Sequence, residues 1–418
     1  MRVLVFWEPT GLTIERANPY APLLAEALRP LGVECVAGFP QNLTTEWIGR
    51  HAGEYQVLHL HWPWGLYASD SLDETVKRCA AMLDALLLAR SMGCKIVWTM
   101  HNLYPHDSDT HDLDHLARLA IASAASAVIV HCEHARALLR QVFHRQERVF
   151  TIRHGHFMAP YPNAIGIAEA RRRLGFEDRH FVYLFFGTVR ANKGVERLLD
   201  SFRALPGEDL RLLFAARVCN SYGAAVVEAC RQSDPRIVLY ESEFYGKDEL
   251  QLFYNAADVA VFPFTDILTS GSAITALGFY CPVIVPALGC LPELVDESVG
   301  LLYDPIAPDG LPRALQQAAG IRREDLRPGI ERKLAELNWH DIATLPFGRP
   351  RATQVFAERR ADRWSGSSSH GLRWRVEFPA GCAATLALIL CSTRMAPDPR
   401  FSMWTATGTS TTGLGGGR

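Results

Sequence analysis

The sequence predicts an α/β protein with two doubly wound parallel sheets, because two series of short apolar runs alternate with segments of helical spacing. The runs of the first series are 3–6, 57–61, 95–100, 127–131 and 149–152. The runs of the second series are 181–186, 210–215, 236–240, 258–262 and 282–285. Such short, continuously apolar runs are typical of strands buried on both faces of a parallel sheet. Their alternation with helices indicates βαβ units with right-handed crossovers.

A stretch rich in Pro, Gly and Arg, 159–175, separates the two series of strands. We therefore expect an N-terminal Rossmann-like domain over 1–162 and a C-terminal one over 175–340, facing each other across a cleft. A crossing helix is expected over 341–364. Gly, Ser, Thr, Arg and Trp dominate from about Ser365, which predicts a poorly ordered or atypical tail over 365–418.

The composition is ordinary for a soluble globular protein. The 418 residues are 48% apolar and 21% charged, and a chain of this length can form two hydrophobic cores. A net charge of −2 gives no electrostatic basis for nucleic acid as the main partner. No apolar stretch reaches the roughly 18–20 residues of a membrane-spanning helix. The N-terminus opens directly into a strand-like run, so we expect no signal peptide and a cytoplasmic location.

The ten cysteines are scattered, without a Cys-x-x-Cys pair or the Cys/His spacing of zinc sites. Cys94, Cys281 and Cys290 adjoin apolar runs, where a buried free thiol is the usual state. This pattern favours a reducing compartment over a disulfide scaffold.

A phosphate site is predicted where the strand 181–186 ends. Gly187 lets a ligand approach the backbone closely, and Arg190 and Lys193 precede a helix that opens at Gly194. Basic side chains beside a helix N-terminus are suited to a diphosphate. The alternative is a solvated turn with incidental basic residues.

A second phosphate-binding feature is predicted after the strand 258–262. There Ser270, Gly271 and Ser272 stand at the start of an apolar helix, where hydroxyl and backbone N–H groups suit phosphate oxygens. The alternative is simple capping of the helix by a hydroxyl group. Both features lie in the same predicted sheet, which favours a nucleoside diphosphate as the ligand.

Four segments together resemble the donor-binding half of GT-B glycosyltransferases. They are Phe186-Gly187-Thr188 with Lys193-Gly194, then 254–259, then Pro282-Val283-Ile284-Val285, then Pro292-Glu293-Leu294-Val295. The resemblance implies that Arg190 and Lys193 contact the donor diphosphate and that Glu293 belongs to the donor site. It also implies a nucleotide sugar as substrate, with no cofactor and no bound metal.

The chain departs from the retaining members of that family at one place. Those members carry two glutamates eight positions apart, and the corresponding residues here are Ile267 and Thr275, with Asp266 out of register. The glutamate contacts to the donor therefore cannot be carried over. The 269–273 run instead resembles bacterial exopolysaccharide and β-mannosyl-type transferases, which favours inversion at the anomeric carbon and leaves retention open.

Polar and aromatic residues cluster where two strands of the first sheet end. His61, Trp62 and Trp64 follow one strand, and Asn102 follows another. Aromatic rings stack on sugar faces, and imidazole and amide groups bond to hydroxyls, so we expect these residues to bind an acceptor sugar. The alternative is that histidines such as His59 and His61 only complete internal hydrogen bonds. These segments, together with His131 and the string 153–156, resemble the acceptor-side half of the same bacterial subgroup. The resemblance implies that His154 also belongs to the acceptor site.

An inverting transfer needs a base that takes the proton of the acceptor hydroxyl. Asp107 and His101 are equal candidates, and Glu8 is a third. A carboxylate or a neutral imidazole suits this task at cellular pH.

The segment 101–115 also permits a metal-site hypothesis. It contains the potential ligands His101, His106, Asp107, Asp109, His111, Asp112, Asp114 and His115. Catalytic metals usually draw ligands from several strand ends, however, and acidic residues at a helix start have a sufficient structural reason. We therefore expect no metal.

Taken together, these observations predict transfer of a hexosyl group from a nucleotide sugar to a lipid-linked or glycan acceptor. The resemblance favours mannosyl transfer from GDP-mannose in exopolysaccharide or glycolipid synthesis, with a UDP-hexose as the next candidate. It also implies peripheral contact with the inner face of the cytoplasmic membrane, for which 171–173 is a basic candidate. The alternatives are a GT-B-like epimerase or phosphorylase and a non-catalytic sugar-binding homologue.

Overall fold

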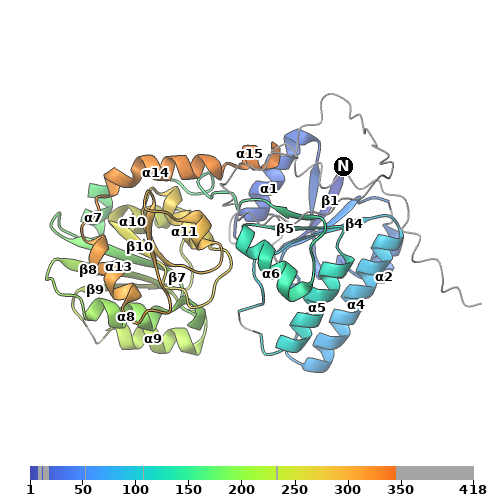
Figure 1. The fold of residues 1–418 in the computed structure, drawn as a ribbon, viewed down its shortest axis with the longest axis horizontal. Helices are drawn as coiled ribbons and strands as arrows, with labels where there is room; N and C mark the ends of the chain where they lie inside the picture. The colour runs from blue at the N-terminus through green and yellow to red at the C-terminus, as the bar shows by residue number, and fades with distance from the viewer. Residues whose placement is uncertain (8–11, 13–17, 52, 107, 232–233, 345–418) are drawn as a thin grey trace, which may run out of the picture.

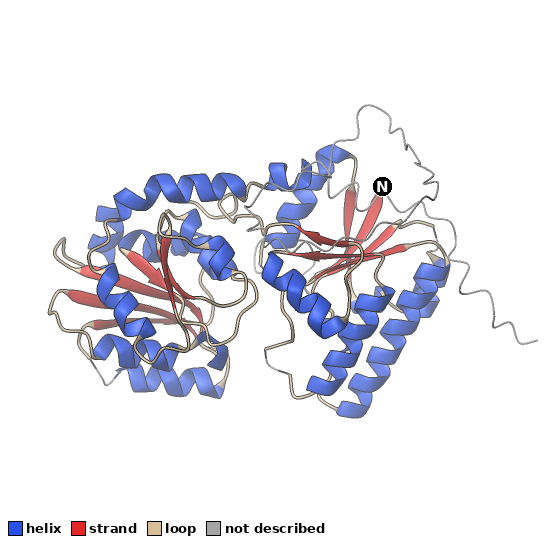
Figure 2. Ribbon diagram, in the orientation of Figure 1, coloured by secondary structure: helices blue, strands red, loops and turns tan. Residues whose placement is uncertain are grey.

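The computed structural model describes residues 1–7, 12, 18–51, 53–106, 108–231 and 234–344. These residues form two six-stranded parallel sheets, each covered by helices on both faces (Figures 1 and 2). The α/β fold with two doubly wound sheets is therefore confirmed. The boundaries expected for the two domains stay predictions. The 365–418 tail and residues 345–364 of the expected crossing helix lie outside the described residues, as do Glu8 and Asp107.

The first sheet has the strand order β2-β1-β3-β4-β5-β6. Its strands are β1 (Arg2–Phe6), β2 (Glu34–Gly38), β3 (Val57–Leu60), β4 (Lys95–Thr99), β5 (Ala127–Val130) and β6 (Val149–Thr151). Its helices are α1 (Tyr20–Leu28), α2 (Thr45–Arg50), α3 (Trp64–Tyr67), α4 (Leu72–Ser91), α5 (His111–Ala124) and α6 (Glu133–Phe143), with short 3-10 turns η1 (Arg29–Leu31) and η2 (Pro40–Asn42).

The second sheet has the order β12-β11-β10-β7-β8-β9. Its strands are β7 (Phe181–Thr188), β8 (Leu210–Arg217), β9 (Ile237–Ser242), β10 (Val259–Val261), β11 (Val283–Pro286) and β12 (Gly300–Tyr303). Its helices are α7 (Ile167–Leu174), η3 (Ala191–Lys193), α8 (Val195–Arg203), α9 (Ser221–Arg231), α10 (Lys247–Ala256), α11 (Gly271–Gly278), α12 (Leu291–Leu294) and α13 (Gly310–Ala318).

The strand order fixes where a ligand fits in each half. In the first sheet the order reverses between β1 and β3, and in the second between β7 and β10. In open parallel sheets, ligands bind in the crevice outside the carboxyl ends of the strands at such a point. Trp7 and His61 follow β1 and β3, and η3 and the loop before α11 follow β7 and β10.

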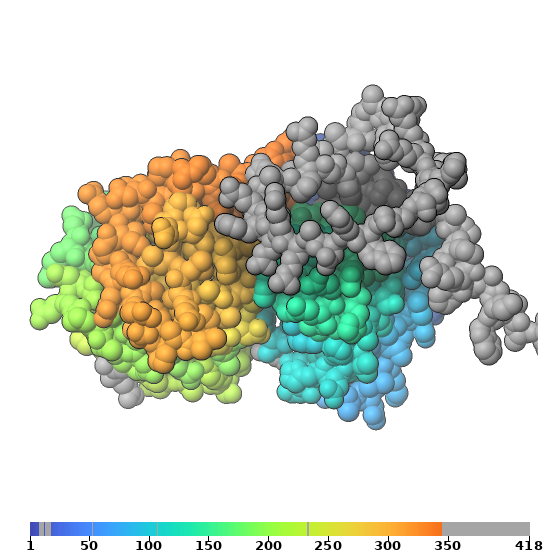
Figure 3. All heavy atoms as spheres, in the orientation of Figure 1, coloured from blue at the N-terminus to red at the C-terminus, as the bar shows by residue number. Residues whose placement is uncertain are grey.

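The chain crosses back to its N-terminal half after the second sheet. Helix α14 (Arg323–Glu336) runs along the C-terminal half, and α15 (Trp339–Thr344) packs against α1 (Figure 1). The indole N–H of Trp339 donates a hydrogen bond to the carbonyl of His156 at 2.7 Å. Figure 3 shows the two halves as two masses that touch near the middle of the view. None of the described helices combines the length and apolar character needed to cross a membrane.

Candidate active site between the two sheets

Five histidines gather at and beyond the carboxyl ends of the first sheet. His59 lies in β3, and the others follow β3, β4, β5 and β6 in turn: His61, His101, His131 and His154. All five are buried, with exposed fractions between 1% and 7%. Parallel strands bring their ends to one edge of the sheet, and for this reason histidines from different strand ends come into contact.

Three of these histidines form a hydrogen-bonded chain whose proton positions follow from its anchored end. His131 Nδ1 lies 2.8 Å from the carbonyl of Ile152, which can only accept, so this nitrogen carries the proton. His131 Nε2 then accepts from His101 Nδ1 at 3.2 Å, and His101 Nε2 accepts from His61 Nδ1 at 3.0 Å. Both ring nitrogens of His101 are therefore engaged.

Burial keeps this cluster neutral. Desolvation lowers the pKa of His59 and His154 to about 3 and that of His131 to about 4. It also holds the pKa of His61 and His101 well below the usual value, and the neighbouring histidines act in the same direction. At neutral pH the cluster therefore consists of uncharged rings that can accept protons only through unoccupied lone pairs.

Aromatic rings cover part of the cluster. Trp62 stacks on Trp7 at 4.4 Å between ring centroids, and Tyr20 touches His101 and His154 edge-on at 4.7 Å each. The structure thus brings Trp62, predicted to bind the acceptor, together with His61 and His154. Trp64 does not join them. It lies in α3 and packs against a different hydrophobic core from the one that Trp62 contacts.

Asn102 follows β4 and is linked to the second half through one histidine. Its side chain is 3.2 Å from His106 Nε2, and the Asn192 side chain from η3 is 3.1 Å from His106 Nδ1. Asn102 therefore contacts the donor-side loop through His106.

Two glycines shape the loop at the end of β7, where the phosphate site is predicted. Gly187 has φ +145° and Gly194 has φ +62°, a region that favours glycine. A Cβ atom on Gly194 would lie 2.1 Å from the carbonyl oxygen of Pro263, so glycine is needed where the loop after β10 crosses. The ammonium group of Lys193 lies over the Phe264 ring at 4.6 Å. Burial, together with the charge of Arg190, lowers its pKa to about 8.

The run before α11 acts first as a helix cap. Ser270 Oγ accepts a hydrogen bond from the backbone N–H of Ala273 at 3.1 Å, so this hydroxyl serves the helix, as the capping alternative predicted. The amides of Gly271 and Ser272 also belong to the first turn, whose N–H groups have no partner within a helix. Thr269 Oγ1 donates to the carbonyl of His101 at 2.9 Å, which joins this helix start to the first half.

The side chain of Glu293 forms hydrogen bonds between the two halves. Its carboxylate oxygens accept hydrogen bonds from the backbone N–H groups of Glu133 and His134, the first residues of α6, at 3.1 Å each. A carboxylate suits the positive end of a helix. The role of Glu293 in donor binding stays a prediction.

The expectation for Cys290 is wrong, because Cys290 forms a disulfide with Cys132. Their Cα atoms are 5.5 Å apart, at the start of α12 and at the residue before α6. Spacing along the chain could not reveal the pair, since 158 positions separate the two residues. Cys94 and Cys281 are free thiols as expected, and Cys281 is buried.

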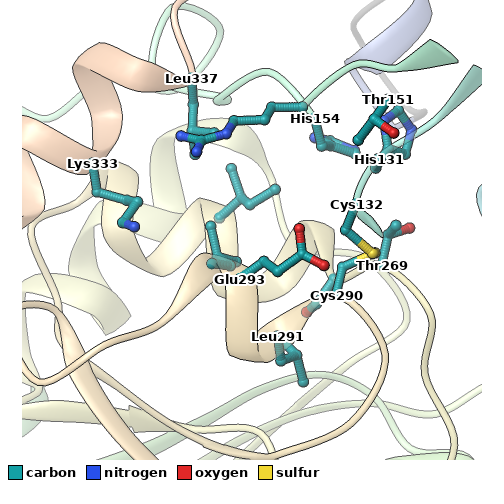
Figure 4. A pocket seen from close by; sticks show the side chains of 14 residues that line it. His131, Cys132, Thr151, His154, Thr269, Cys290, Leu291, Glu293, Lys333 and Leu337 are labelled. Carbon is teal, nitrogen blue, oxygen red and sulfur yellow. A yellow bond between two sulfur atoms is a disulfide. The ribbon is translucent and has the colours of Figure 1, made fainter. Parts of the chain in front are cut away.

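A pocket lies between the halves (Figure 4). Its lining includes His131, Thr151, Arg153, His154, Thr269, Ser270, Ile274, Leu291, Lys333 and Leu337, with the disulfide and Glu293 at one side. Lys333 and Leu337 come from or just beyond α14, and no motif in the sequence indicated them. Within the described residues, no three His, Cys, Asp or Glu side chains are grouped to hold a metal ion.

Comparison with known proteins finds similarity to glycosyltransferases. Residues 180–320 match the family described as Glycosyl transferases group 1. A GDP-mannose:glycolipid 4-beta-D-mannosyltransferase from Xanthomonas campestris pv. campestris is 28% identical over 252 residues, which cover 58% of this chain and 64% of that protein. The match thus spans less than two thirds of that relative.

Two solved structures share the fold. Sucrose-phosphate synthase from Thermosynechococcus elongatus aligns with a TM-score of 0.64 at 20% identity, covering 82% of this chain and 96% of that one. Anabaena HepE in complex with UDP-glucose aligns with a TM-score of 0.62 at 16% identity, covering 82% and 97%. The chain therefore has the GT-B fold, and its residues 180–320 are similar to the group 1 glycosyltransferases.

Proposed function

We propose that this chain is a glycosyltransferase that moves a hexosyl group from a nucleotide sugar to a sugar-containing acceptor. The observation that carries the proposal is the cavity between the halves. On one side lie Thr269 and Ser270, just before α11, and on the other lie His131 and His154 with their aromatic neighbours. Donor and acceptor bound on opposite sides would meet there, shielded from water.

The donor diphosphate is assigned to the second sheet. Gly187 leaves open space above the backbone, and Arg190 and Lys193 add positive charge beside it. The first turn of α11 adds amides and the positive end of a helix. Phosphate charge would be neutralised from two strand ends at once, which supports a nucleoside diphosphate and a reaction that needs no metal.

GDP-mannose is the proposed donor, and a glycolipid is the proposed acceptor at the cytoplasmic membrane surface. The name of the Xanthomonas relative supports both assignments. UDP-glucose, present in the HepE complex, is the second candidate donor.

Inversion is the proposed stereochemical course. Ile267 is buried, and Thr275 Oγ1 donates to the carbonyl of Gly271 at 2.8 Å, so neither position offers a carboxylate to the donor. Asp266 is largely exposed, with a side-chain exposure of 81%. Asp107 and His101 are the bases that the sequence predicts, and both ring nitrogens of His101 are engaged in hydrogen bonds.

Ligand-induced stabilisation tests the donor assignment. The protein is heated with GDP, UDP, dTDP or ADP, each in EDTA and in magnesium. A ligand at about 100 times its dissociation constant adds about 2.7 kcal/mol of stability. We expect stabilisation by GDP in EDTA, and its loss in Lys193→Ala but not in Lys77→Ala, an exposed lysine on α4.

Turnover then separates the possible functions. The nucleotide sugar selected by heating is incubated alone and with octyl β-glucoside as a glycolipid surrogate. Transfer or slow donor hydrolysis supports the proposal. Interconversion of the nucleotide sugar would indicate an epimerase, and binding without either reaction would indicate a non-catalytic homologue.

A further inference from the structure

The hydrogen bonds of the histidine cluster decide which ring can take a proton from a ligand in the cavity. Two of the five histidines, His131 and His154, line it. His131 uses both ring nitrogens, one on the carbonyl of Ile152 and one on His101. His154 uses only Nδ1, which donates to the carbonyl of Gly155 at 2.8 Å. Its Nε2 is therefore the unprotonated nitrogen, and within the described residues no hydrogen bond occupies that lone pair.

Ring contacts place His154 beside the helix that is assigned to the donor. Its ring centroid is 5.1 Å from that of Phe157. The Phe157 ring in turn lies 3.2 Å from the position of a Cβ atom on Gly271, the first residue of α11. One aromatic ring thus separates the imidazole from the helix N-terminus.

Neighbouring groups give this nitrogen a suitable state before and after proton transfer. Burial lowers the pKa of His154 to about 3, so the ring is neutral and its lone pair is available at cellular pH. An imidazolium formed there would be stabilised by the negative diphosphate, because opposite charges attract strongly in a dry site. The base would therefore gain strength only when the donor is bound.

We propose that His154 is the catalytic base of this reaction, an inference that rests on the proposed function and on inversion. The acceptor oxygen forms a bond to the anomeric carbon while the bond from that carbon to the diphosphate oxygen breaks. The bonding pair leaves with the nucleoside diphosphate, and the hydroxyl proton passes to His154 Nε2. The backbone carbonyl of Gly155 keeps the proton on Nδ1 and so orients the ring.

Two substitutions at this position test the proposal. His154→Asn keeps an amide that can donate to the carbonyl of Gly155 but removes the base, and His154→Ala leaves space for a small molecule. We expect both to lower transfer to octyl β-glucoside, and hydrolysis of the same nucleotide sugar, by about 100-fold or more. Donor affinity should stay unchanged. Added imidazole should restore turnover in His154→Ala and not in His154→Asn. His340→Asn, an exposed histidine of α15, is the matched control and should behave as wild type.

Three results would overturn the assignment of His154. The first is wild-type turnover in both variants. The second is a loss of turnover together with a loss of donor affinity, where added imidazole does not restore turnover in His154→Ala. This result would make His154 a structural residue. The third is a loss confined to Asp107→Asn, which would assign the proton to that carboxylate. Absence of both transfer and hydrolysis in the wild-type protein would instead refute the proposed function.

Discussion

Gly155 packs against the indole of Trp339, and a side chain there would have no space. A Cβ atom on Gly155 would lie 2.2 Å from that ring, and the indole is also held by its hydrogen bond to the carbonyl of His156. We expect Gly155→Ala to lower the free energy of unfolding by about 1–3 kcal/mol, because α15 has to shift. Urea denaturation measures the change. Gly166→Ala is the control, since no atom lies within 4 Å of its Cβ position, and equal effects of the two substitutions would contradict the prediction.

The lowered pKa of Lys193 predicts how donor binding depends on pH. Its pKa is about 8 in the free protein, and a bound diphosphate favours the protonated form, so donor binding takes up a proton as pH rises above this value. The dissociation constant of a nucleotide sugar should therefore increase between about pH 7 and pH 9, while the diphosphate charge stays constant. Calorimetric titration of wild type and Lys193→Gln checks this. The same pH slope in both proteins would exclude Lys193 from the donor site.

The sequence indicated which histidines meet but not what each ring nitrogen does. The ends of parallel strands converge in any doubly wound sheet, so His61, His101 and His154 could be placed near one another from the pattern alone. The chain of hydrogen bonds depends on ring orientation and on one backbone carbonyl, that of Ile152. No sequence pattern carries this information, and for this reason His101 was a base candidate equal to Asp107.

At the scale of elements, α11 has a structural cap and a proposed ligand site at the same end. Ser270→Ala removes the capping hydrogen bond and should cost about 1 kcal/mol of stability. Ser71→Ala makes the same change at α4, where Ser71 Oγ accepts from the N–H of Glu74 at 3.2 Å. Denaturation should show similar losses in both variants. Only Ser270→Ala should weaken GDP binding, because only α11 is assigned to the donor, and equal GDP affinity in the two variants would remove α11 from the site.

Ten of the twelve strands follow from apolar runs in the sequence, and the two that do not are edge strands. β2 and β12 each pair with only one neighbour, and each contains residues that are exposed or partly buried. An edge strand has water on one side and needs fewer apolar residues. The contacts of Glu293 with α6 could not be predicted from the sequence either, because they depend on how the two halves pack against each other.

At the scale of the whole molecule, polar and covalent links cross between the halves. They include the Cys132–Cys290 disulfide, the Glu293 contacts with α6, and the bond from Thr269 to the carbonyl of His101. A donor that enters between the halves requires them to separate, and the disulfide opposes this. Dithiothreitol should therefore increase the association rate of the donor, measured by stopped-flow fluorescence.

Two cysteine variants distinguish reduction of this disulfide from other effects of dithiothreitol on the protein. Cys132→Ser should bind donor at the faster rate with or without dithiothreitol. Cys219→Ser, which removes an exposed free thiol, should respond like the wild type. Identical rates in the oxidised and reduced wild-type protein would show that the halves do not need to separate at this point.

The disulfide also makes a covalent ring of the chain from residue 132 to residue 290, and the connection between the two sheets lies inside that ring. One proteolytic cut between β6 and α7 would consequently open the ring without releasing either fragment. The nicked protein would migrate as a single species in electrophoresis without reductant and as two fragments with it. A polypeptide of two lobes thus has, when oxidised, the topology of a loop with two tails.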